Sequence, residues 1–329
     1  MEVFMSYFSF DLNPQSHKCA VIGCHGVGSV IAHALMQSGL INALVLIDED
    51  IRISDGLAAD LCGALPLHGT TDVWAGEYAD LVGCDLIVLA IGVVPLYENA
   101  QADLVEINTP LIRKAVSNIL AYNTNAVLIV ASQPQEIMTY MTLRYSGLPQ
   151  NRVIAPGTLP YAWRLCDLIA KYLNADPTQI RTMILGPANE HATVCWSQTQ
   201  IFGMALPFYL EATGRSSDAL ILHSLFEDVQ YAHKRAENAF GCAVNSMANA
   251  VLLIARAILL NTNTLHAVCT MADAYCEMSH VCMSVPCLLG KGGAFVFPEL
   301  LPAPPELDHL QKSAAAMRAK LLYAEQLFV

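Results

Sequence analysis

Short apolar runs alternate with segments of helical periodicity from Lys18 onward, and this alternation limits the fold more than any other feature of the chain. The apolar runs are too short for helices and carry almost no polar residues. Strands of a parallel sheet have this composition because helices cover both of their faces. The expected strands are Cys19–Ile22, Ala43–Ile47, Asp85–Ile91 and Ala126–Ala131, and the helices between them include Gly26–Ser38 and Glu106–Tyr122.

The pattern changes after about residue 155. Amphipathic helices are expected first, over Leu159–Leu173, Ser217–Phe240 and Asn245–Leu260, followed by strands at Leu265–Thr270 and Val281–Leu289 and a last helix over Glu306–Gln326. We therefore predict an α/β protein in three parts. These are an N-terminal arm (1–17), a doubly wound parallel sheet (18–155) and a mixed α/β, or α+β, domain (156–329).

A glycine-rich loop lies between the first strand and the first helix. It reads Val21-Ile22-Gly23-Cys24-His25-Gly26-Val27-Gly28, and Asp48 ends the next strand. Glycines at this junction allow a dinucleotide pyrophosphate to approach the helix N-terminus, and an acidic residue about 20 positions later binds the ribose diol. The loop therefore predicts a Rossmann-type NAD site. The expected cofactor-binding residues are Gly23, His25, Gly26, Gly28, Asp48 and Gly92.

The charge of the chain excludes some partners. Its 29 acidic and 17 basic residues give a net charge of −12, which is the wrong sign for binding nucleic acid. Only 14% of residues are charged, against about 25% in a typical soluble domain. We expect the missing surface charge to mark subunit contacts, in a homo-oligomer (dimer or tetramer) or in a larger assembly.

No apolar stretch is long enough for a transmembrane helix, and residues 1–17 carry neither a signal-peptide nor a transit-peptide pattern, so a cytoplasmic location is expected. The 11 cysteines are scattered through apolar runs without the paired spacing of a metal site. We expect reduced, buried thiols and no metal. His223 and His233 lie ten residues apart in one expected helix, too far for a metal pair on one face, and are expected at the surface.

From Lys18 to its C-terminus, the chain resembles the L-lactate/malate dehydrogenase family, and the lactate branch more closely. The resemblance implies a Rossmann half, a mixed half that completes the substrate site, NAD, and assembly into dimers or tetramers. Its anchors are Gly23–Gly28, Val45–Asp48, Gly56–Leu61, Cys84–Val88, Ser146–Ile154, Trp196–Ser197 and Ser284–Gly290.

The resemblance also implies which residues occupy the catalytic positions. The family histidine that moves the hydroxyl proton falls on Ala188, and its aspartate partner falls on Tyr161. The loop arginine that polarises the carbonyl falls on Gln101. The residue that contacts the substrate side chain and so determines substrate specificity falls on Pro95. General acid–base help is worth about 10²–10⁴ in rate, and a methyl group cannot supply it.

Two substrate-binding positions are partly retained. Arg164 matches the arginine that clamps the substrate carboxylate, although it could instead pair with an internal acid such as Glu190 or Glu98. Gln133 replaces an asparagine before a proline, and Gln133–Pro134 is expected to keep the turn with a cis bond. Tyr161 and Trp163 are expected to pack in the space that the lost groups leave.

These substitutions lead to three hypotheses. The first is a catalytically inactive member of the family that acts as a structural or binding subunit, because His and Asp have both been replaced by uncharged residues. The second is an NAD-dependent oxidoreductase that acts on a 2-hydroxy or 2-keto acid through an altered site, in which His191 could replace the missing imidazole. The third is a nucleotide or metabolite sensor. His25 occupies a position that is usually glycine, so NAD binding is expected to be weakened or absent.

Overall fold

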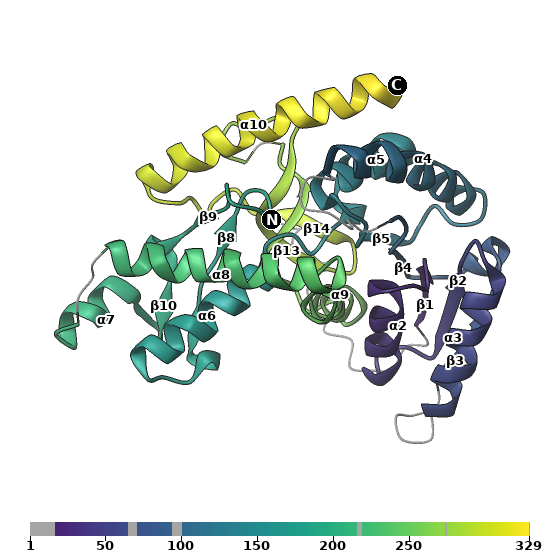
Figure 1. Ribbon diagram of the computed structural model, residues 1–329, viewed down its shortest axis with the longest axis horizontal. Helices are drawn as coiled ribbons and strands as arrows, with labels where there is room; N and C mark the ends of the chain where they lie inside the picture. Colours follow the sequence, from purple (N-terminus) through teal and green to yellow (C-terminus); the bar gives the residue numbers. More distant parts are fainter. Residues whose placement is uncertain (1–16, 65–70, 94–100, 216–218, 274, 329) are drawn as a thin grey trace, which may run out of the picture.

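The structure is a computed structural model and describes residues 17–64, 71–93, 101–215, 219–273 and 275–328 (Figure 1). A six-stranded parallel sheet has the order β3-β2-β1-β4-β5-β6. The strands are β1 (Lys18–Ile22), β2 (Ala43–Ile47), β3 (Asp72–Ala75), β4 (Leu86–Leu89), β5 (Val127–Val130) and β6 (Val153–Ile154). The order reverses between β1 and β4. In such sheets, ligands bind at the carboxyl ends of the strands where the order reverses.

Helices join these strands, and the two that the sequence predicts, near Gly26–Ser38 and Glu106–Tyr122, are present. They are α2 (Val27–Gln37), α3 (Ile51–Ala64), α4 (Gln101–Leu120) and α5 (Gln135–Ser146), with short 3-10 turns η2 (Tyr78–Leu81) and η3 (Gln150–Arg152). The central strands are buried along nearly their whole length because helices pack on both faces of the sheet. In Figure 1, α4 and α5 lie together, and they contact each other directly.

The second half combines helices with small antiparallel sheets. Its helices are α6 (Leu159–Leu173), α7 (Leu206–Ala212), α8 (Ala219–Phe240), α9 (Val244–Leu259) and α10 (Pro304–Phe328), with 3-10 turns η4 (Pro177–Gln179) and η5 (Trp196–Gln198). A three-stranded sheet contains β12 (Thr264–Met271), β13 (Cys282–Gly290) and β14 (Gly293–Val296). The short strands are β7 (Ile180–Arg181), β8 (Ile184–Leu185), β9 (Thr193–Val194), β10 (Gln200–Ile201) and β11 (Met204–Ala205).

The two halves share a packed interior. Helix α9 of the second half packs on α2 of the first, and α5 contacts both β12 and β13. One hydrophobic core runs from the parallel sheet through α9 to β13, while a smaller core lies under α6, α7 and α8. The predicted α/β architecture with a mixed second domain is therefore confirmed.

The structure also tests some smaller predictions. The strands β3, β6, β7–β11 and β14 were not predicted, and all of the expected arm except His17 lies outside the described residues. All 11 cysteines are free, and eight are buried, but Cys62 is exposed and Cys166 and Cys276 are intermediate. Within the described ranges, no single helix is long and apolar enough to cross a membrane. The segments Leu220–Phe240 and Val244–Leu259 reach that composition only as a pair bent by 107°.

Candidate functional site

The glycine-rich loop lies where β1 ends and α2 begins. Gly28 packs so tightly that an added Cβ would lie 1.8 Å from the carbonyl oxygen of Gly23. Gly26 has a φ of +49°, and an added Cβ there would meet no atom within 4 Å. His25 and Gly26 are exposed. The loop therefore brings α2 close to the strand while leaving open space at the helix N-terminus, and both features suit a bound pyrophosphate.

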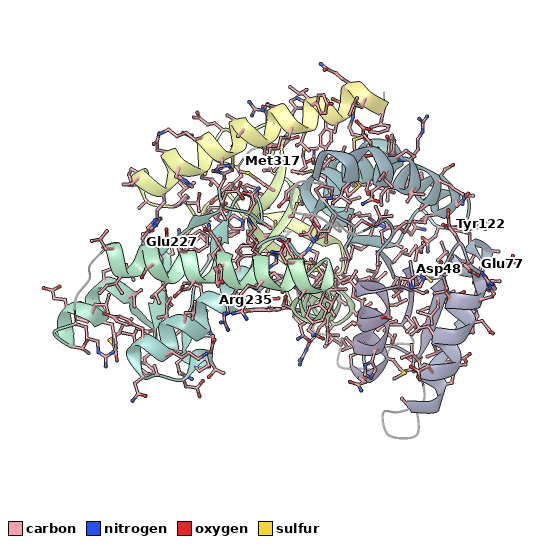
Figure 2. All side chains as sticks on the ribbon, in the orientation of Figure 1. Asp48, Glu77, Tyr122, Glu227, Arg235 and Met317 are labelled. Atoms are coloured by element: carbon pink, nitrogen blue, oxygen red, sulfur yellow. The ribbon has the colours of Figure 1, made fainter. Side chains whose placement is uncertain are left out.

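Asp48 lies beside this loop, at the carboxyl end of β2 (Figure 2). Its Oδ2 accepts a hydrogen bond from the backbone N–H of Cys24 at 2.8 Å, and its Oδ1 accepts one from the N–H of Asp50 at 3.1 Å. Asp48 is half-buried, so the carboxylate is oriented by the protein and still reachable by a ligand. An acidic side chain held in this way suits the two hydroxyls of a ribose. The residues present therefore fit a dinucleotide such as NAD.

The loops that follow β4 and β5 are joined by one buried side chain. Asn108 of α4 accepts a hydrogen bond from the N–H of Val93 at 2.9 Å and donates to the carbonyl oxygens of Val93 and Gln133. Gly92 has a φ of +120°, and an added Cβ there would lie 2.5 Å from the Asn108 amide. The Gln133–Pro134 peptide bond is cis, as the sequence predicts. Gly92 and Gln133 are thus held together at the carboxyl edge of the sheet.

The two positions at which the family motif places its histidine and aspartate are brought together. The hydroxyl of Tyr161, on α6, donates a hydrogen bond to the carbonyl oxygen of Ala188 at 3.1 Å. On the other side, the carboxylate of Glu136 accepts a hydrogen bond from the N–H of Ala188 at 2.6 Å. Tyr161 and Glu136 are both buried. The predicted packing of Tyr161 against the vacated position is confirmed.

Burial raises the pKa of both acidic groups at this position. Desolvation is the main cause for Tyr161, and the charges of Glu237, Glu136 and Glu190 raise its pKa further. Desolvation also raises the pKa of Glu136, against the opposing effect of the hydrogen bond from Ala188. Tyr161 therefore remains a neutral phenol that can donate a hydrogen bond.

His233 is not at the surface, as we had expected, but lies against Tyr161. Its ring centroid is 4.4 Å from that of Tyr161, with 39° between the ring planes, and only 17% of its side chain is exposed. Sequence motifs could not reveal this contact, because it depends on how α8 packs on α6. A signal was nonetheless present: Phe226, Val229 and His233 have the i, i+3, i+7 spacing of a buried helix face.

The other candidate side chains that the structure describes are exposed and contact different partners. The side chain of His191 is 53% exposed, and its Nε2 lies 3.7 Å from Glu190 Oε1. Arg164 is 47% exposed and pairs with Asp167 at 3.1 Å, and within the described residues it has no ion pair with Glu190, one of the two acids named as alternative partners. Gln101 is the first residue of α4, and its side chain is not described. Pro95 and Glu98 lie outside the described residues.

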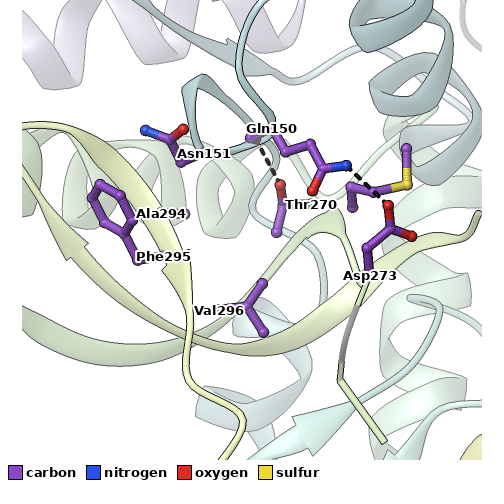
Figure 3. A pocket seen from close by; sticks show the side chains of 8 residues that line it. Gln150, Asn151, Thr270, Asp273, Ala294, Phe295 and Val296 are labelled. Atoms are coloured by element: carbon purple, nitrogen blue, oxygen red, sulfur yellow. Dashed lines mark hydrogen bonds between the residues drawn. The ribbon is translucent and has the colours of Figure 1, made fainter. Parts of the chain in front are cut away.

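Two depressions lie elsewhere on the described surface. The first, of about 220 Å³, is shown in Figure 3, where Gln150 donates a hydrogen bond to Asp273 at 2.9 Å. The second, of about 480 Å³, is lined by residues that include Leu40, Trp163 and Arg256. Neither depression includes a predicted cofactor- or substrate-binding residue, but the second includes Trp163, which we had expected to pack in the vacated site with Tyr161. Among the described residues, no group of three or more His, Cys, Asp or Glu side chains could hold a metal ion.

Both halves of the chain match families of known domains. Residues 17–155 match the lactate/malate dehydrogenase NAD binding domain, and residues 162–327 match the lactate/malate dehydrogenase alpha/beta C-terminal domain. L-lactate dehydrogenase of Acetivibrio thermocellus is 29% identical to the chain, covering 92% of this chain and 95% of that protein. L-lactate dehydrogenase of Priestia megaterium is 30% identical, with coverage of 93% and 96%.

Solved structures give the same result. The minor L-lactate dehydrogenase from Enterococcus mundtii superposes with a TM-score of 0.87 and 28% identity, covering 93% of this chain and 98% of that one. The malate dehydrogenase from Plasmodium falciparum has a TM-score of 0.89 and 20% identity, covering 95% of this chain and 100% of that one, and it supports the fold alone.

These relatives overturn the first functional hypothesis. We expected a catalytically inactive subunit, but proteins that match nearly the whole chain are L-lactate dehydrogenases, so the oxidoreductase alternative is the better supported of the two. The hypothesis was wrong because it counted only the groups lost at motif positions 188, 161 and 101. It did not consider side chains from other helices, such as His233, which contacts Tyr161. The chain belongs to the lactate/malate dehydrogenase family.

Proposed function

We propose that this protein is an NAD-dependent oxidoreductase that interconverts a 2-hydroxy acid and the corresponding 2-keto acid through an altered site. The observation that carries the proposal is the position of Asp48, whose carboxylate is fixed by the N–H of Cys24 beside an open helix N-terminus. The names of the relatives, which are L-lactate dehydrogenases over nearly their full length, support the same reaction class.

NAD would be held by the loop from Gly23 to Gly28 and by Asp48. Backbone N–H groups at the start of α2 suit its pyrophosphate, and the Asp48 carboxylate suits a ribose diol. When bound, the cofactor supplies the hydride acceptor or donor of the reaction. The protein orients it at the edge where the loops after β4 and β5 are tied together by Asn108.

Arg164 is the proposed clamp for the substrate carboxylate. It shares its acidic partner, because Asp167 Oδ2 also accepts a hydrogen bond from Lys171 at 2.8 Å. Arg164 can therefore turn from Asp167 to a substrate while Lys171 still balances the aspartate. A guanidinium binds a carboxylate through two parallel hydrogen bonds, which fixes the orientation of the acid as well as its position.

NADH oxidation by the purified protein tests the proposal. We expect saturable binding of NADH, detected by energy transfer from tryptophan, and turnover with at least one member of a panel of 2-keto acids that includes pyruvate and oxaloacetate. Arg164→Gln should raise KM for the keto acid without changing NADH affinity. Arg181→Gln, an exposed arginine on β7, is the matched control and should leave both unchanged. NADH binding without turnover on any 2-keto acid would contradict the proposal.

We also propose that His25 lowers the affinity for NAD relative to a glycine at this position. The residue is exposed at the loop that faces the pyrophosphate, where a side chain competes with the approach of the phosphates. His25→Gly should bind NADH more tightly, as measured by the same fluorescence titration. Unchanged or weaker binding would contradict this part of the proposal.

The protein is further proposed to act as a homo-oligomer in the cytoplasm. The low share of charged residues and the exposed apolar side chains of Leu322, Tyr323 and Leu327 on α10 support self-association. Free thiols at all 11 cysteines are consistent with a reducing compartment. Sedimentation of the purified protein should give a mass above that of the monomer.

A further inference from the structure

Helix α8 contains two histidine–glutamate pairs, each with the glutamate four residues after the histidine, and the two pairs lie in different environments. His223 Nε2 lies 3.5 Å from Glu227 Oε1, and His233 Nε2 lies 3.3 Å from Glu237 Oε1. The first pair faces water, since the His223 side chain is 70% exposed. The second faces the protein, since the His233 side chain is 17% exposed and stacks on Tyr161. Burial alone therefore distinguishes two otherwise similar histidine–glutamate pairs.

Tyr161 connects His233 to the position where the family motif places its histidine. Its ring stacks on the imidazole, and its hydroxyl reaches the carbonyl oxygen of Ala188. The imidazole of His233 thus lies one aromatic ring away from the backbone of residue 188. The side chain at 188 is only a methyl group, so the motif position itself has no group that can transfer a proton.

We propose that His233 is the proton-transferring residue of this site, an assignment that rests on the proposed oxidoreductase function. Glu237 Oε1 lies 3.3 Å from Nε2 of the imidazole and so orients the ring. No hydrogen bond of the other nitrogen, Nδ1, is found within the described part of the chain, so this nitrogen is the one we assign to a substrate oxygen. Histidine is the side chain that most often transfers a proton to or from a reacting group in enzymes.

In the direction of reduction, the N–H bond of the imidazolium breaks and its proton forms the O–H bond of the new hydroxyl group. The bound reduced nicotinamide would supply the hydride that the carbonyl carbon gains, so that the keto acid would be reduced as the cofactor is oxidised. The neutral imidazole then takes a proton from water. In the opposite direction, the neutral imidazole accepts the hydroxyl proton as the carbon loses its hydride.

Other titratable groups surround this pair. Glu237 comes from the same helix, Tyr161 from α6, Glu136 from α5, and Glu190 from the segment after β8. Tyr161 remains a neutral phenol, because burial and the three carboxylates all raise its pKa. It therefore positions the imidazole and donates to Ala188, and it does not exchange the substrate proton itself.

The test compares His233→Gln with His223→Gln in the full-length protein. For His233→Gln, we expect kcat/KM for a 2-keto acid to fall by about 10²–10⁴, with NADH affinity unchanged. His223→Gln removes the exposed copy of the pair from the same helix and should leave both quantities unchanged. NADH affinity measured by tryptophan energy transfer shows that each variant is folded.

A binding measurement provides a readout that does not depend on turnover. Oxamate, an unreactive analogue of a 2-keto acid, should bind the NADH complex of the wild-type protein more weakly as the pH rises, because it loses the imidazolium hydrogen bond. In His233→Gln, this pH dependence should be absent, while His223→Gln should retain it.

The outcomes separate the two proposals. If the wild-type protein turns over a 2-keto acid and His233→Gln stays within about threefold of its kcat/KM, the assignment of His233 fails and the proposed function stands. A pH dependence of oxamate binding that persists in His233→Gln would also overturn the assignment. If the wild-type protein binds NADH but reduces no 2-keto acid, both proposals fail.

Discussion

The carboxylate of Glu136 accepts a hydrogen bond from the backbone N–H of Ala188, with 2.6 Å between the two atoms. Glu136 is only 7% exposed and lies in the first turn of α5, directly after the cis proline turn. The bond fixes the segment that contains residue 188 from one side, while Tyr161 fixes it from the other. Residue 188 is thus held at the site even though its side chain carries no reactive group.

Glu136→Gln should change how stability depends on pH. Burial raises the pKa of Glu136 in the folded state above its ordinary value of 4.5, so protonation favours the folded protein. That contribution is complete below pH 4.5 and is lost as the pH rises through the raised pKa. Glutamine keeps an acceptor and does not titrate, so the variant should gain stability relative to wild type over this range.

Urea unfolding between pH 4 and pH 8 measures the effect, with roughly 1.4 kcal/mol expected for each unit by which the pKa is raised. Glu211→Gln is the control, since Glu211 is exposed on α7 and its substitution should give a pH-independent difference. If Glu136→Gln instead loses stability relative to wild type as the pH rises, the pKa of Glu136 is lowered in the folded protein and not raised.

Gly28→Ala should be far more damaging than Gly26→Ala. A Cβ at position 28 would overlap the carbonyl oxygen of Gly23, so α2 would have to move away from β1. We expect a loss of about 3 kcal/mol or more in the free energy of unfolding. At position 26 there is open space, and only the backbone conformation, with φ +49° and ψ −113°, is unfavourable for a residue with a Cβ, which costs about 1–3 kcal/mol.

Chemical unfolding of both variants measures these differences, and NADH titration shows whether the loop still binds. Equal losses for the two substitutions would contradict the close contact between Gly28 and Gly23.

Asn108→Ala should weaken both the fold and the site. Asn108 is fully buried, and its removal leaves three backbone groups of Val93 and Gln133 without their partner. We expect a loss of about 2–4 kcal/mol in stability, together with a higher KM for the keto acid, because the two loops are no longer tied.

Asn123→Ala is the matched control. Asn123 is also buried, and it binds the carbonyl oxygens of Leu81 and Cys84 before β4, at the opposite edge of the sheet. It should lower stability by a similar amount and leave KM unchanged. If both variants raise KM equally, the effect is a general loss of stability and not a local one.

Asp48→Asn should weaken binding of NADH and reduce discrimination against NADPH. The substitution removes a negative charge that suits the ribose diol of NAD and repels a 2′-phosphate. We expect NADH affinity to fall by about tenfold, or ~1.4 kcal/mol, while NADPH affinity is unchanged or rises. Fluorescence titration with both cofactors checks this, with Asp72→Asn at the exposed start of β3 as the control. If Asp48→Asn lowers the affinity for NADH and for NADPH equally, the adenosine ribose does not bind at Asp48.

Much of the fold was predictable because buried parallel strands are apolar on both faces. The bounds expected for β2 match the structure at both ends, and β1 begins only one residue earlier than predicted. Strand β3 was missed because it lies at the edge of the sheet and begins with an exposed Asp72. The two-residue strands β7–β11 are too short to give any periodic signal.

The site was predictable where it depends on local motifs. Gly28, Asp48 and the cis bond before Pro134 follow from short sequence patterns, and the structure places them at the same sheet edge. The contact between His233 and Tyr161 depends on the packing of two helices far apart in the sequence. The buried-face spacing of His233 indicated its orientation, but not which residue it would meet.

The hydrogen bond from Tyr161 to the carbonyl oxygen of residue 188 limits which substitutions this part of the molecule can accept. An imidazole introduced at 188 alone would have to share space with the phenol that holds the backbone there. A histidine at 188 with an aspartate at 161 therefore requires coordinated replacement at both positions. A single substitution at either position would leave the pair incomplete.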